Sequence, residues 1–242
     1  MYFKFPLPLL LCILFSCNSN SSGEKTSESK KELSGEEQVL VNIDSLKQKA
    51  QDGDLIVRMT DDLISEHIKL LNEKDKKYSH AGLVFKNNGQ LFVYNISPGE
   101  DGGDTLKMTP IDTFVNPAKN LSCALYRYDL LNQEKDSLHS LLKQYKKNGV
   151  SFDGVYDLKT NKKMYCAELI DKALTQATNN RIIIRQANIP QKMQGNVYYF
   201  FRKENISKET IAVRKIITID NLYLRPDCQL IISFPLKYFP GQ

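Results

Sequence analysis

The chain has 242 residues, a formal net charge of +5, and an ordinary globular composition with 41% hydrophobic and 25% charged residues. This length suits one domain or two small ones and is ample for a hydrophobic core. The charge is mild, and Lys and Arg are spread along the chain, so nothing indicates a nucleic-acid-binding surface.

The N-terminus reads as an export signal. One Lys is followed by an apolar run over residues 5–15, which is too short to span a bilayer as a helix but typical of a signal-peptide core. The run ends in "LFSC" at 14–17, which resembles a bacterial lipobox, in which a small residue precedes a lipidated Cys. We expect residues 1–16 to be a lipoprotein signal peptide and Cys17 to carry acyl chains that hold the protein at a membrane. The alternative is an ordinary secretory signal with a chance Cys.

The residues that follow Cys17 predict a tether. Residues 18–36 contain six Ser and a single large apolar residue, Leu33, and cannot bury enough surface to fold. We expect residues 17–36 to be a lipidated flexible tether and residues 37–242 to form the folded domain. The residues just after Cys17 are uncharged, which favours the outer membrane, facing the periplasm.

The first part of this domain has two predicted helices around a short strand. Helical spacing runs from Glu37 to a stop at Gly53, and "DLIVRM" at 54–59 is β-prone. Residues 61–76 predict a helix capped by Asp61 or Asp62. His67 lies beside its apolar face, and we interpret it as a partly packed residue without a catalytic role. The residues expected on that inward face are Leu63, Ile64, Ile68 and Leu71.

The middle of the chain predicts a hairpin, a strand and two helices. "SHAGLVF" at 79–85 and "QLFVYNI" at 90–96 are joined by the turn signal "KNNG", and "LSCALYRY" at 121–128 reads as a buried strand. An amphipathic helix over 131–149 carries His139 on a solvated face. A second helix over 165–177 turns Leu169, Ile170, Ala173, Leu174 and Ala177 inward.

The C-terminal part predicts three strands, at 180–185, 196–201 and 228–234. Helices therefore precede a mostly antiparallel set of strands, and further helices and strands follow. This order favours an α+β fold with one sheet.

Cysteine usage excludes the common zinc motifs. After export and lipidation, Cys123, Cys166 and Cys228 would remain, an odd number that leaves at least one thiol free or paired between chains. No CxxC or HxxxH spacing exists, so we expect no metal site.

Cys166 is the first candidate for chemistry, because it follows a polar loop and opens an amphipathic helix. A helix N-terminus stabilises a thiolate, so we expect a nucleophile with a low pKa. His80, flanked by small residues at the start of a strand, is the candidate base, and Asn95 on the neighbouring hairpin strand could orient its ring. The alternatives are a small buried Cys, a satisfied core His and an edge-strand Asn.

Five motifs together resemble the permuted papain-like amidases of the YiiX/YaeF type, relatives of NlpC-type cell-wall peptidases and of the lecithin:retinol acyltransferase family. His80 precedes Cys166 by 86 residues, which is the permuted order. The motifs are "GDLIVR" at 53–58, "YSHAGLV" at 78–84, "FVYNI" at 92–96, "FDGVY" at 152–156 and "YCAELI" at 165–170.

The resemblance implies a circularly permuted papain-like fold, with a mostly antiparallel sheet packed by helices. It makes Cys166 the nucleophile and His80 the base, and it places the third polar residue at Asn95, where relatives often have an acid. Glu168 and Tyr165 match recurrent positions and are expected to support the site from behind the reacting groups. Asp153 also matches, without an assigned role. Residues 186–217 match no quoted motif and read as an insertion particular to this chain.

The resulting expectation is an envelope lipoprotein that cleaves an amide through a Cys–His thioester mechanism, and location favours peptidoglycan peptides as its substrate. Two alternatives stay open: a lipid acyl hydrolase or acyltransferase of the same fold, and a non-catalytic envelope binding module. The proposed chemistry requires neither a metal nor an organic cofactor.

Overall fold

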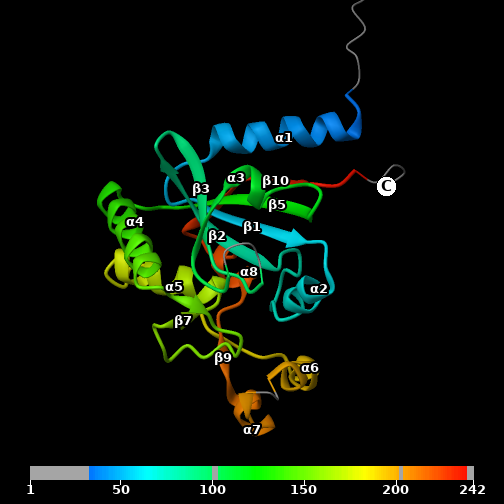
Figure 1. Cartoon of the computed structure of the whole chain (residues 1–242), viewed down its shortest axis with the longest axis vertical. Coiled ribbons are helices and arrows are strands. Elements are labelled where there is room, and N and C mark those ends of the chain that lie inside the picture. Colours follow the sequence, from blue (N-terminus) through cyan, green and yellow to red (C-terminus); the bar gives the residue numbers. More distant parts are fainter. Residues whose placement is uncertain (1–32, 100–102, 202–203, 239–242) are drawn as a thin grey trace, which may run out of the picture. The chain divides into compact units, whose positions relative to one another are not determined.

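The computed structural model describes residues 33–99, 103–201 and 204–238, which belong to one compact unit beginning at Leu33 (Figure 1). The predicted signal peptide, Cys17 and most of the predicted tether lie outside these residues. Within the described ranges, no helix has the length and apolarity needed to cross a bilayer.

A six-stranded sheet, in the order β10-β5-β1-β2-β3-β4, forms the centre of the unit, and all of its pairings are antiparallel. The predicted hairpin is present: Asn88 and Gly89 both adopt positive φ, 49° and 80°, as its tight turn requires. The strands are β1 (Leu55–Thr60), β2 (His80–Asn87), β3 (Gln90–Asn95), β4 (Lys107–Pro110), β5 (Asn120–Tyr128) and β10 (Cys228–Pro235).

Helices cover both faces of the sheet. Successive residues of a strand point to opposite sides, so the strands present apolar side chains on both faces for the helices to bury. Leu55 and Val57 pack in the cluster that contains the inward faces of α4 (Asn132–Lys147), α5 (Cys166–Ala177) and α8 (Ile219–Tyr223). Ile56 packs in a second cluster, beneath α1 (Gly35–Lys49) and α3 (Ile111–Phe114). The α+β prediction is confirmed.

A third hydrophobic cluster lies outside the sheet. It joins the end of α2 (Leu63–Lys69) to α6 (Gln191–Phe201) and α7 (Lys208–Val213). The remaining short strands are β6 (Ser151–Phe152), β7 (Lys163–Met164), β8 (Ala187–Asn188) and β9 (Lys215–Ile216), paired β6 with β7 and β8 with β9.

Two predicted tail strands are wrong. Residues 196–201 belong to α6, where Met193 and Val197 are buried one helical turn apart, so helical packing overrides the β-propensity of the aromatic residues. Residues 180–185 form no strand, since the amides of Ile182 and Ile184 bond to side chains of Thr178 and Asp171 instead of to another strand.

Three further details differ from prediction. Helix α1 begins at Gly35, two residues before Glu37, because Ser34 and Glu37 form a capping box. Leu63 and Ile64 are 79% and 64% exposed rather than turned into the core. His139 is half-buried rather than solvated: its ring stacks on Phe85 at 4.4 Å and meets the Tyr94 hydroxyl at 3.2 Å.

Candidate active site

Cys166 is the first residue of α5, as predicted, and only 8% of it is exposed. The two-residue strand β7 leads into this helix. Backbone N–H groups of Ala81, Ala167 and Cys166 itself stabilise the anionic form of the sulfur. The thiol therefore lies at the start of α5 and against the start of β2.

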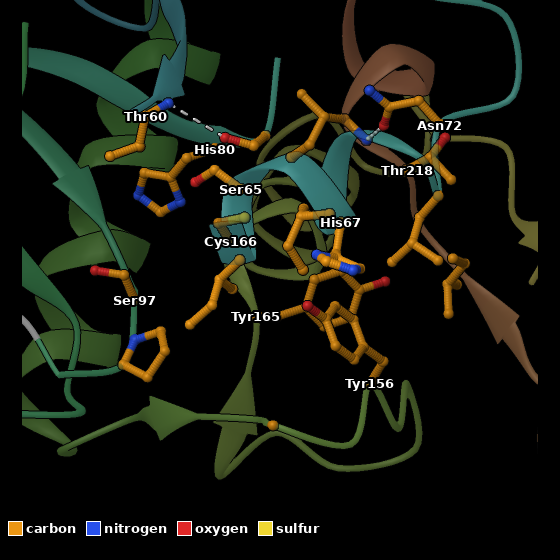
Figure 2. A pocket seen from close by; sticks show the side chains of 18 of the residues that line it. Thr60, Ser65, His67, Asn72, His80, Ser97, Tyr156, Tyr165, Cys166 and Thr218 are labelled. Atoms are coloured by element: carbon orange, nitrogen blue, oxygen red, sulfur yellow. Dashed lines mark hydrogen bonds between the residues drawn. The ribbon is translucent and has the colours of Figure 1, made fainter. Parts of the chain in front are cut away.

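His80 is the first residue of β2 and faces the same cavity as Cys166 (Figure 2). Its Nε2 lies 3.3 Å from Oδ1 of Asn95, and its ring packs against Phe114 with a centroid distance of 5.7 Å. Ala81, whose amide meets the Cys166 sulfur, directly follows His80. The fold thus brings the three residues predicted for the reaction to one end of the sheet.

The surroundings of Asn95 fix which nitrogen of His80 is basic. The Asn95 amide nitrogen donates to the Val93 carbonyl at 3.1 Å and to Thr109 Oγ1 at 2.9 Å. A carbonyl can only accept, so the amide oxygen must be the atom that faces His80. It accepts from Nε2–H, which leaves Nδ1 of His80 as the nitrogen able to take a proton.

The thiol of Cys166 does not have the low pKa expected for it. Burial raises its pKa to about 11, although the three backbone amides and the charge of Arg58 oppose this. Burial raises the pKa of Cys123 and of Cys228 further, to about 12. The prediction is wrong because desolvation of the anion outweighs the helix N-terminus. The thiol is neutral near pH 7, so a base must remove its proton during attack.

Glu168 and Tyr165 hold the start of α5. Glu168 is fully buried, accepts a hydrogen bond from the Tyr165 amide at 3.3 Å and pairs with Lys172 at 2.8 Å. Burial raises the pKa of Glu168 to about 7. The Tyr165 hydroxyl donates to the Ile217 carbonyl at 3.2 Å and accepts from the Ile217 amide at 2.5 Å, which ties α5 to the segment after β9.

Asp153 organises the loop before β7. Its carboxylate accepts hydrogen bonds from the amides of Val155 at 2.9 Å and Asp157 at 2.5 Å. The loop carries Tyr156, which has a positive φ of 55° and packs against the Tyr165 ring at 4.5 Å.

The cavity at the thiol has a volume of about 520 Å³, and most of its wall is apolar. Tyr156, His67 and Arg58 also line it, and sequence reasoning assigned none of them to the site. A charged residue within the β-prone run at 54–59 was the available signal for Arg58. The apolar lining is Ile64, Ile68 and Leu71 from α2 and its end, Met193 and Val197 from α6, and Ile96, Pro98, Phe152, Ile189, Ile216, Ile217 and Ile219.

Among the described residues, no group of three or more His, Cys, Asp or Glu is placed to hold a metal ion. The model of the family "Permuted papain-like amidase enzyme, YaeF/YiiX, C92 family" matches residues 49–215. The matched range includes most of residues 186–217. Comparison with curated proteins gives no significant match.

One solved structure that matches is that of metalloprotein YiiX from Escherichia coli O157:H7. It is 19% identical, has a TM-score of 0.62, and the match covers 77% of this chain and 98% of that one. With the family match, this confirms the predicted permuted papain-like fold.

Proposed function

Because the chain belongs to the permuted papain-like amidase family of the YaeF/YiiX type, we propose that it is a cysteine amidase acting on an amide with an apolar acyl group. Cys166 is the nucleophile, His80 the general base and acid, and Asn95 the residue that orients the His80 ring. This assignment is supported by the shared cavity and by the 3.3 Å contact between His80 and Asn95.

The reaction proceeds through a thioester. His80 Nδ1 takes the thiol proton as Sγ bonds to the carbonyl carbon, and the π-electron pair moves to the carbonyl oxygen. Backbone N–H groups at the start of α5 stabilise this oxyanion. On collapse the C–N bond breaks, and the leaving nitrogen takes the proton from His80. Water, deprotonated by His80, then attacks the thioester, releasing the acid and restoring the thiol.

The apolar wall of the cavity is the observation that favours an acyl chain as the substrate class. Most of the side chains that α2, α6 and the segment around β9 turn into it are hydrocarbon. Each methylene buried there contributes about 0.8 kcal/mol, whereas burying the charged groups of a peptidoglycan peptide costs free energy. An acyl chain therefore suits the cavity better than the peptidoglycan peptide expected from location.

The exposed side chains of Leu63 and Ile64 support the same substrate class. Ile64 is 64% exposed yet lines the cavity with Ile68, so the apolar surface continues from the wall to the outside. We place the domain at the membrane through lipid on Cys17, in the envelope and facing the periplasm. A domain held at the membrane in this way could reach an acyl amide in the bilayer.

The test is turnover of acyl p-nitroanilides with 2 to 16 carbons, beside purified muropeptides. We expect kcat/KM to rise up to about fourfold per added methylene until the cavity is full. Cys166→Ser should abolish turnover. Cys166-dependent cleavage of muropeptides alone would restore the peptidoglycan assignment, and no Cys166-dependent turnover of either class would favour the binding module.

A matched pair of variants tests the wall itself. Val197→Phe narrows the cavity and should shorten the longest chain accepted, while turnover of the two-carbon substrate stays unchanged. Val213→Phe, on α7 and 73% exposed, is the control and should keep the wild-type chain-length profile. Equal profiles for both variants would contradict an acyl chain seated against α6.

A further inference from the structure

Arg58 is a buried charge on the central strand of the sheet. It lies in β1, is only 5% exposed, and pairs across the sheet with His80 of β2 and Cys123 of β5. Alternation along β1 turns its neighbours Val57 and Met59 into the cluster beneath α5, so Arg58 points to the opposite face. His80 lies on the same face and packs against Phe114 there.

Phe114 fixes the positions of both Arg58 and His80. The Arg58 guanidinium donates to the Phe114 carbonyl at 2.9 Å, and its central carbon lies 4.3 Å from the centroid of the Phe114 ring. The His80 ring tilts against the same aromatic ring at 33°. A guanidinium held by a carbonyl and a ring face has little freedom to swing away.

The charge of Arg58 reaches the thiol. Arg58 and Cys166 line the same cavity, and among the described lining residues Arg58 is the one Lys or Arg. Its charge lowers the pKa of Cys166 against the effect of burial. For Cys123, burial is the resolved influence on the pKa, and the thiol stays at about 12.

Asn95, the third residue of the site, does not offset the positive charge of Arg58. An acid at position 95 would put a negative charge beside His80, where it would offset the charge of Arg58. Asn95 is neutral, so no such offset arises from that position. The other titratable groups that line the cavity are His80, Asp62, His67, Tyr156 and Tyr165.

We propose that Arg58 is a charge-stabilising residue of the amidase site, which favours the anionic sulfur of Cys166 while His80 takes its proton. The inference rests on the proposed function, in which that sulfur attacks a carbonyl. Its role is electrostatic, so it requires the positive charge and not the shape of the guanidinium alone. No substrate needs to be known to test it.

The test is the rate of Cys166 alkylation by iodoacetamide from pH 6 to pH 11, read by mass spectrometry. Arg58→Met should move the pH profile of Cys166 upward by about one unit and slow labelling at pH 8 about tenfold. Arg58→Lys keeps the charge and should stay within about threefold of wild type. Arg127→Met removes a sheet arginine that does not line the cavity and is the control.

Cys123 and Cys228 report whether each variant is folded, because both are buried and, unlike Cys166, do not line the cavity. An Arg58→Met variant that stays folded and labels like wild type would overturn the proposal. If Arg58→Met unfolds, Arg58→Gln decides, because it also removes the charge but keeps a donor that can bond to the Phe114 carbonyl: an upward shift of the profile supports the role of the charge, and an unshifted profile contradicts it. Absence of amide turnover with a normal alkylation profile would instead count against the proposed function.

Discussion

If Asn95 orients the His80 ring, removing its side chain should lower turnover for a reason distinct from the accompanying loss of stability. Asn95→Ala removes the 3.3 Å contact with His80 Nε2, so the ring loses the group that fixes its orientation. The base is still present but misoriented, and we expect acyl p-nitroanilide turnover to fall by roughly 10- to 1000-fold, or about 1.4–4 kcal/mol of transition-state stabilisation.

The same substitution also lowers the free energy of unfolding. Asn95 is only 1% exposed, and its amide nitrogen donates to Val93 and Thr109, which lose these bonds in the Ala variant. Leaving buried polar groups unpaired should cost about 2–3 kcal/mol, which lowers Tm by roughly 5–10 °C for a chain of this size. Asn221→Ala is the control, because Asn221 is a buried amide bonded to Glu73 and Arg185 and lies outside the cavity.

Asn95→Asp tests the role of the amide oxygen separately from the role of the amide nitrogen. One carboxylate oxygen can still accept from His80, but the other would face the Val93 carbonyl, where a donor is required. Turnover should therefore rank wild type, then Asp, then Ala, while neither variant regains wild-type stability. Wild-type turnover by Asn95→Ala, or an Asp variant slower than Ala, would refute the orienting role.

Three other outcomes follow from single residues. Radiolabelled palmitate should enter the wild type and not Cys17→Ser, and equal labelling would contradict lipidation. Iodoacetamide should modify Cys166 at least tenfold faster than Cys123 below pH 11 and hardly at pH 6. The pKa values of the two thiols are about 11 and about 12, the thiolate fraction falls tenfold per pH unit, and Cys123 is in addition fully buried; equal rates would contradict this. Glu168 binds its proton more tightly when folded, with a pKa of about 7 against 4.5, so urea unfolding should show about 3 kcal/mol of stability lost between pH 4.5 and 7. Glu168→Gln should flatten that slope, and an unchanged slope would place the titration elsewhere.

Local patterns predicted the parts of the site that depend on neighbouring residues in the chain. The turn signal at 86–89 fixed the hairpin that brings His80 and Asn95 together, since the turn sets the register of its strands. The apolar period after Cys166 placed it at the start of α5. These features follow from spacing along the chain.

The features that prediction missed depend on contacts between distant segments. Met193 and Val197 make α6 a helix because a cluster shared with α2 covers them, which a local reading of 196–201 could not reveal. The raised pKa of Cys166 depends on how deeply the fold buries the thiol. Arg58 belongs to the site because β1 pairs with β2, and its own sequence pattern resembles any half-buried strand.

The cavity is built by two hydrophobic clusters that have different buried members and meet at Tyr156, which packs against both. Cys166 and Tyr165 belong to the cluster around α5, whereas Met193 and Val197 belong to the cluster formed by α2, α6 and α7. The two clusters are coupled at two points, the Tyr156 ring against Tyr165 and the hydrogen bonds between Tyr165 and Ile217. Substrate range can therefore diverge by substitutions on α6 that reshape the wall, as long as these two contacts next to the nucleophile are kept.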